Sequence, residues 1–203
     1  QVGRAGPACP GGDGLAVLAR CAGCASSGRT LAGPGGGSRP ALAGRLGGDD
    51  YLEGSWYGND TIWRTCLDLQ RILRYGRADG SLAATPQRRV ITLTDAIVGG
   101  EGEGPLANTP VPSGFLTGGL NPAAVEWVHA RLMGLDPARL PLVREAFGRF
   151  AFPLVSFPPS AIVVRTPTGE VPAQEVEPAA GREFRLPAGW RGHCELAVPA
   201  GQP

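Results

Sequence analysis

The chain has 203 residues, of which 19 are basic and 18 acidic, so its formal net charge is +1. This balance lacks the positive field that nucleic-acid binding or attachment to an anionic membrane surface requires, and we expect neither partner. All the basic residues are arginine, which excludes Schiff-base chemistry and the phosphate-binding lysine of a P-loop.

The sequence shows no sign of a membrane or secretory segment. No stretch approaches the roughly 18 consecutive apolar residues of a spanning helix, and no basic start precedes an apolar signal region. We therefore expect a cytoplasmic protein. Because the only methionine is Met133, we interpret the chain as a fragment of a longer protein.

Residues 1–48 contain no aromatic residue and no glutamate. Such a composition buries too little apolar surface to offset its ordering entropy, so we predict a disordered or non-native leader. Residues 49–203 are then the C-terminal part of a single α/β domain. The leader contains Cys9, Cys21 and Cys24, and the CAGC spacing is typical of one half of a zinc or iron–sulphur site. The alternative is that these cysteines have no role.

The first regular pattern predicts a helix that ends at Gly76. Its apolar positions recur at steps of four, three and four, and we expect them to form the buried face: Ile62, Cys66, Leu69 and Leu73. Asn59 or Asp60 supplies the N-cap. The same two residues, with Trp56 and Tyr57, form a possible pocket entrance.

The rest of the chain predicts strands and helices in alternation. Residues 88–98 and 113–119 are expected to be strands, the first ending at Gly99, and 100–112 an irregular loop because it is rich in Gly and Pro. Asn121, Pro122 and Gly134 mark the start and end of a helix, and a shorter helical piece is expected to run from Asp136 to about Phe147. Short strands are expected over 161–198. The predicted fold class is α/β, with a partial mixed sheet, two or three packed helices and a β-rich C-terminal tail.

A glycine-rich segment with two carboxylates follows the first strand. Glu101 and Glu103 alternate with glycines, and Asp95 lies six residues before Glu101. The negative charge argues against phosphate binding, whereas carboxylates and loop carbonyls suit a hard cation such as Mg²⁺ or Ca²⁺. We take these three residues as candidate ligands for a metal or a polar molecule. The alternative is that the glycines serve tight turning and the acids keep the loop solvated.

A second candidate lies on the predicted helix at 121–134. The spacing of Glu126 and His129 brings them together, as an acid–base pair or the outer shell of a metal site requires. The alternative is a solvated surface pair. Ser113 and Thr117 show no histidine–carboxylate partner in a nucleophile motif, so no hydrolase triad is predicted. His193 and Cys194 are expected on opposite faces of a strand.

Four motifs resemble a known family in their order along the chain: WYGNDTIWRTCLDLQRIL, TDAIVGGEGEGP, GGLNPAAVEWVHARLMGLDPARLPLVREAF and GWRGHCEL. They are similar to the C-terminal half of the prokaryotic family called domain of unknown function 362, over roughly residues 50–198. The resemblance implies an α/β fold, a frequent association with iron–sulphur centres elsewhere in its members, and no established reaction. Glu126 stands where the family more often has aspartate, and Cys194 where an aliphatic residue is usual.

The resemblance also implies a missing part. Family members carry a preceding half with a lysine- and histidine-bearing segment, and nothing in this chain corresponds to it. Two hypotheses remain open. The parent protein is a metal-dependent or redox enzyme with the acidic loop near its site, using a divalent cation, or an iron–sulphur cluster in full-length relatives. Alternatively, the chain is a non-catalytic binding or interaction module for which a small-molecule ligand is possible. The oligomeric state is left open.

Overall fold

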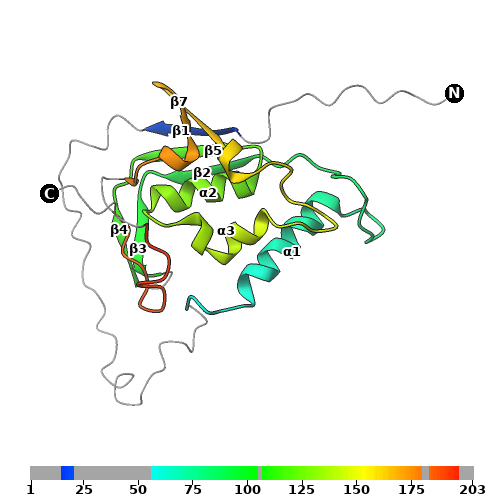
Figure 1. Ribbon diagram of the computed structural model, residues 1–203, viewed down its shortest axis with the longest axis horizontal. Coiled ribbons are helices and arrows are strands. Elements are labelled where there is room, and N and C mark those ends of the chain that lie inside the picture. The colour runs from blue at the N-terminus through cyan, green and yellow to red at the C-terminus, as the bar shows by residue number, and fades with distance from the viewer. Residues whose placement is uncertain (1–14, 21–55, 105–106, 180–182, 197–203) are drawn as a thin grey trace, which may run out of the picture.

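The computed structural model describes residues 15–20, 56–104, 107–179 and 183–196 (Figure 1). These residues include a five-stranded sheet in the order β2 (Thr92–Ala96), β5 (Phe115–Gly119), β1 (Leu15–Arg20), β6 (Val163–Thr166) and β7 (Gly169–Pro172). The pairing of β1 with β6 is parallel, and the other pairings are antiparallel. A separate hairpin joins β3 (Gly99–Glu103) to β4 (Ala107–Val111). The predicted α/β fold with a mixed sheet and few helices is confirmed.

Strand β1 corrects the expectation for six residues of the leader. Residues 15–20, with the sequence LAVLAR, lie between β5 and β6 and pair with both. Five apolar residues in succession form a short run typical of a strand, and pairing on two sides satisfies its backbone groups. The remainder of 1–48, with its cysteines, and the boundary at 48/49 lie outside the described residues.

Helix α2 (Pro122–Leu132) follows its sequence signals closely. The Oδ1 of Asn121 accepts hydrogen bonds from the backbone N–H groups of Ala123 and Ala124, at 3.0 and 3.3 Å, and Pro122 takes the first turn. Gly134, with φ of 78°, ends the helix. The predicted apolar residues of α2 are buried: Ala124, Val125, Val128 and Leu132. Several of them pack with Phe115, Ile162 and Val164 in the main core.

The other helices lie on the far side of α2 from the sheet (Figure 1). The predicted helix at 136–147 is divided into a 3₁₀ turn, Pro137–Arg139, and helix α3 (Pro141–Ala146). Pro141 causes the division, because a proline stands best in the first turn of a new helix. Helix α1 (Ile62–Tyr75) contacts α3. In the described part of the chain, no helix is long and apolar enough to cross a bilayer.

The predicted buried face of α1 is wrong. Ile62 and Leu69 are 57% and 59% exposed, and Leu73 is exposed too, whereas Leu67 and Tyr75 are buried. The reason is tertiary. The Tyr75 hydroxyl donates to the Pro153 carbonyl at 2.5 Å, and its ring packs against Phe152. These contacts turn a neighbouring face of the helix inward, which local periodicity does not encode.

Two segments predicted from local composition also differ. In the segment predicted to be an irregular loop, residues 99–103 and 107–111 pair as the strands β3 and β4. Its pairing is reinforced from outside by the Gly102 N–H, which donates to the Arg185 carbonyl at 2.7 Å. In the tail, β6 and β7 and the turn between them agree with prediction, but 183–196 contains turns and isolated bridges in place of strands. His193 and Cys194 lie in these turns.

Candidate functional site

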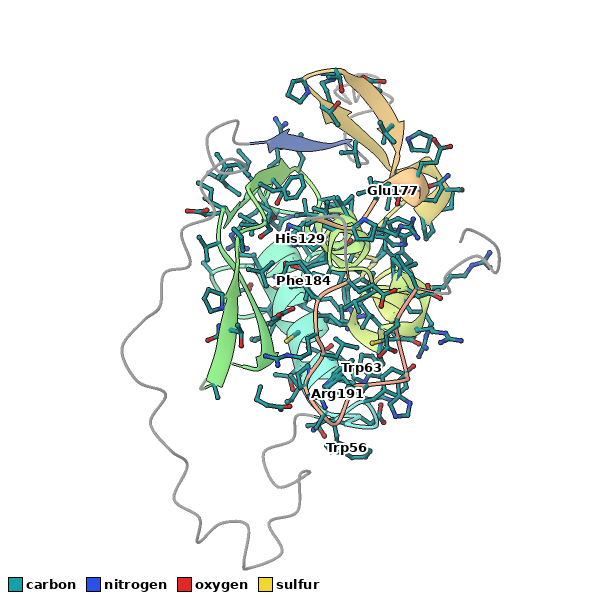
Figure 2. The ribbon with its side chains drawn as sticks, turned by 90° about the vertical axis from the view of Figure 1, so that its left-hand side faces the viewer. Trp56, Trp63, His129, Glu177, Phe184 and Arg191 are labelled. Carbon is teal, nitrogen blue, oxygen red and sulfur yellow. The ribbon has the colours of Figure 1, made fainter. Side chains whose placement is uncertain are left out.

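The acidic residues Glu101 and Glu103 of β3 fasten the 183–196 segment to the hairpin. Glu101 Oε2 accepts from the Arg185 N–H at 2.9 Å. Glu103 Oε1 accepts from the Ala188 N–H at 2.9 Å and from the Arg191 guanidinium at 3.1 Å. Residues two apart on a strand share a face, which explains why both carboxylates reach the same segment. Figure 2 labels Phe184 and Arg191 along this segment, beside the hairpin.

The glycines between these acids allow the segment to approach. Gly102 is buried and has φ of 85°, and a Cβ at this position would lie 2.8 Å from an Arg185 nitrogen. The positive φ disfavours any side chain at this position, and a Cβ would also force the end of the Arg185 side chain to move. The alternation of Gly and Glu serves close docking of the 183–196 segment.

Asp95 lies on the edge strand β2, where its carboxylate accepts the Ile97 N–H at 3.0 Å. Among the described residues, no three His, Cys, Asp or Glu side chains form a group able to hold a metal ion. Glu101 and Glu103 thus both bind the 183–196 segment, whereas Asp95 binds the backbone two residues after it.

Asn59 and Asp60 organise the entrance to α1. Asn59 Oδ1 accepts from the N–H groups of Thr61 and Ile62, at 3.0 and 3.1 Å. The prediction that Asn59 or Asp60 is the N-cap is wrong, because the N-cap of α1 is Thr61, whose side chain makes no cap hydrogen bond. Asp60 forms an exposed ion pair with Arg64 at 3.0 Å, and this pair together with hydrogen bonds lowers the pKa of the Asp60 carboxyl.

A cavity of about 390 Å³ lies among α1, α2, α3 and the 183–196 segment. Its walls are mainly apolar and include Trp63, Met133, Leu140, Leu142, Val143 and Trp190. Glu126 and His129 supply ionisable groups on the α2 side. Figure 2 labels Trp63 and His129, which line the cavity from α1 and α2. Trp190 is held in place edge-on to the ring of Tyr57, with centroids 5.6 Å apart.

A smaller cavity of about 200 Å³ adjoins the first and shares Cys66, Glu126, Leu142 and Val143 with it. Its lining is more polar at one end, where Gln70 and Arg74 of α1 lie. The Arg74 guanidinium donates to the Leu154 carbonyl. The Oε1 of Gln70 is buried and, within the described structure, has no hydrogen-bond partner. The two cavities together therefore offer an apolar chamber with a polar extension.

His129 joins two other side chains. Its Nε2 lies 2.6 Å from the Thr117 Oγ1, and its Nδ1 lies 3.7 Å from the Glu126 Oε1. The predicted pairing of Glu126 with His129 is present, and Thr117, for which no partner in a nucleophile motif was predicted, contacts the same imidazole. Thr117 is 2% exposed on the buried face of β5 and does not line the cavity, whereas His129 does.

One sequence signal points to Thr117. Phe115 and Thr117 are two apart on β5 and share its buried face, so a hydroxyl occupies a core position. A buried hydroxyl needs a partner, and α2 is the helix that packs on this strand. Choosing His129 as that partner requires the helix–strand geometry.

His193 and Cys194 lie apart from the His129 group. The His193 ring stacks on Tyr57, with centroids 4.8 Å apart. Burial, together with the nearby Glu195 charge, raises the pKa of the Cys194 thiol to about 11. This thiol stays protonated at neutral pH and is a poor nucleophile.

The chain matches no family model, and no curated protein and no solved structure is significantly similar to it. The resemblance to domain of unknown function 362 therefore stays a prediction, and function has to be inferred from the cavity and the groups that line it.

Proposed function

We propose that this chain binds a small, largely apolar molecule in the cavity between α1, α2 and α3, with the polar end of the molecule at Glu126 and His129. The observation that carries this proposal is the 390 Å³ chamber itself, with apolar walls and two ionisable groups on one side. Small-molecule sites combine these features: an apolar concavity fixes affinity, and a few convergent polar groups fix orientation.

The binding role is better supported than a cation site at the acidic hairpin. Glu101 and Glu103 already accept hydrogen bonds from the 183–196 segment, and a cation would have to displace Arg185 and Arg191. By holding that segment, the two glutamates keep Trp190 in the cavity wall. Their contribution to binding is therefore through the wall and not through ligand contact.

The proposal is tested with indole, which has an aromatic body and a single polar N–H. Isothermal titration is expected to give a dissociation constant of about 0.1–1 mM, the range that suits a ligand of this size. Leu142→Trp fills the chamber and is expected to abolish the binding heat. Leu116→Trp is the matched control, because Leu116 is exposed on β5 and does not line the cavity.

Two results contradict the proposal. One is the absence of any binding heat up to the solubility of indole. The other is equal loss of binding in both tryptophan variants, because this shows that an added ring anywhere on the chain disturbs the titration.

A further inference from the structure

The two nitrogens of His129 have different surroundings. Nε2 faces the interior, where it lies 2.6 Å from the Thr117 hydroxyl. Nδ1 lies on the side of Glu126, a residue that lines the cavity together with His129. The His129 side chain is 18% exposed, so the ring is held in the protein while one edge stays accessible. Because Thr117 contacts Nε2, Nδ1 is the ring nitrogen left for a ligand.

The Thr117 hydroxyl satisfies Nε2 in every protonation state of the ring. A hydroxyl is both donor and acceptor, and its hydrogen turns about the C–O bond. When Nε2 carries no proton, Thr117 donates to it. When Nε2 carries a proton, in the neutral or the charged ring, the Thr117 oxygen accepts a hydrogen bond from the Nε2–H group. The ring can thus gain or lose a proton at Nδ1 without leaving a buried polar atom unpartnered.

Glu126 provides charge without occupying Nδ1. Its carboxylate lies 3.7 Å from Nδ1, which is longer than a hydrogen bond, and its side chain is 51% exposed. This distance leaves Nδ1 available to a ligand.

We propose that the cavity is a proton-transfer site in which His129 Nδ1 exchanges a proton with a small aromatic or aliphatic molecule that carries a weakly acidic hydroxyl. This inference rests on the proposed binding function. In the forward step the ligand O–H bond breaks, its electron pair stays on oxygen, and an N–H bond forms at Nδ1. The products are an imidazolium and a bound oxyanion, and return of the proton restores both groups. His129 is the catalytic residue and Thr117 a positioning residue.

The probe is 4-nitrophenol, whose anion absorbs visible light and whose neutral form does not. It is added at a pH where the free compound is mainly neutral. Binding is followed by backbone amide shifts, and the proton is followed separately by anion absorbance and by the ring ¹⁵N shifts of histidine. The chain has two histidines, so the ring spectrum contains His129 and one reference, His193.

In the wild-type chain we expect bound anion together with protonation of the His129 ring and no change at His193. His129→Gln is expected to retain binding and to lose at least tenfold of the anion absorbance. Thr117→Val keeps the side-chain shape without the hydroxyl and is expected to reduce the anion several-fold, and Thr117→Ser is expected to restore it. His193→Gln is the control that leaves the anion unchanged.

Each remaining outcome decides between the two proposals. If 4-nitrophenol binds but stays neutral, or if His129→Gln yields as much anion as the wild type, proton transfer is refuted and the binding function stands. If 4-nitrophenol causes no amide shift while indole still binds, proton transfer is refuted and the binding function stands; if neither compound binds, both proposals fall. Should Thr117→Val not fold, the comparison of His129→Gln with Thr117→Ser still decides the question, because only the first loses the anion.

Discussion

Replacing Glu103 with alanine removes the acceptor through which β3 holds the 183–196 segment. Two donors lose their partner, the Ala188 N–H at 2.9 Å and the Arg191 guanidinium at 3.1 Å. Glu103→Gln separates their contributions, since its amide oxygen still accepts from Ala188 but no longer attracts the positive charge of Arg191.

The expected magnitude is modest because the contact is near the surface. Hydrogen bonds to charged groups contribute about 1.5–3 kcal/mol when shielded, but exposed ion pairs contribute about 0–1. The Glu103 side chain is 45% exposed, so we discount accordingly. We expect Glu103→Ala to lower the free energy of unfolding by about 1–1.5 kcal/mol, and Glu103→Gln by about 0.5 kcal/mol or less. For a chain of this size the alanine variant corresponds to a fall in Tm of about 2–6 °C.

Urea unfolding gives the free energy. Tryptophan emission, to which the four tryptophans of the chain contribute, reports a change in their surroundings, which is expected to arise at Trp190. The matched control is Glu170→Ala, which removes a 2.7 Å ion pair with Arg165 between β6 and β7, away from the cavity. We expect this control to lower stability by less than about 0.5 kcal/mol and to leave the emission spectrum unchanged. The reasoning is refuted if Glu103→Ala matches the wild type in both stability and emission, or if Glu103→Gln costs as much as alanine.

Three further predictions concern burial, capping and pH. Leu67→Ala is expected to lower the free energy of unfolding in urea by about 2–4 kcal/mol because Leu67 is 3% exposed. Leu69→Ala on the same helix is expected to lower it by about 0.5 kcal/mol or less. Similar losses of stability in the two variants would contradict the observed orientation of α1. Asn121→Ala is expected to lower stability by about 1–2 kcal/mol, since the side chain both caps α2 and donates to the Leu154 carbonyl at 3.1 Å, and an unchanged urea midpoint would exclude this role. Burial raises the pKa of Cys194 from 9.0 to about 11, so this thiol ionises at a lower pH in the unfolded chain than in the folded one. The free energy of unfolding is therefore expected to fall as the pH rises above about 9. Cys194→Ala is expected to remove this dependence.

Local sequence signals were sufficient where the contacts of an element involve residues that are close to it in the chain. The start of α2 is encoded by Asn121 and Pro122, whose cap and first turn involve only neighbouring residues. Its buried residues follow because the helix is covered by the sheet on the side that its apolar spacing indicates. The mixed α/β character was likewise predictable from the alternation of strand and helix patterns.

Distant contacts decided the rest. The spacing of apolar residues in α1 favours one face, but contacts of Tyr75 with residues 152–153 turn a neighbouring face inward. The glycine-rich hairpin is ordered by a segment more than 80 residues later, which composition alone does not reveal. The pairing of His129 with Glu126 is local and was predicted, but the contact with Thr117 depends on how α2 crosses β5.

The central position of β1 has a consequence for how this sheet is assembled. Its register partners are Phe115–Gly119 on one side and Val163–Arg165 on the other. The first of the described strands can therefore pair fully only after two later strands have formed. Until it inserts, the pair β2–β5 and the pair β6–β7 each present an open hydrogen-bonding edge toward the gap. Assembly with such long sequence separations is intrinsically slow, and open edges are templates for mispairing between chains. Concentration during refolding is therefore expected to govern yield more strongly than the stability of the finished domain.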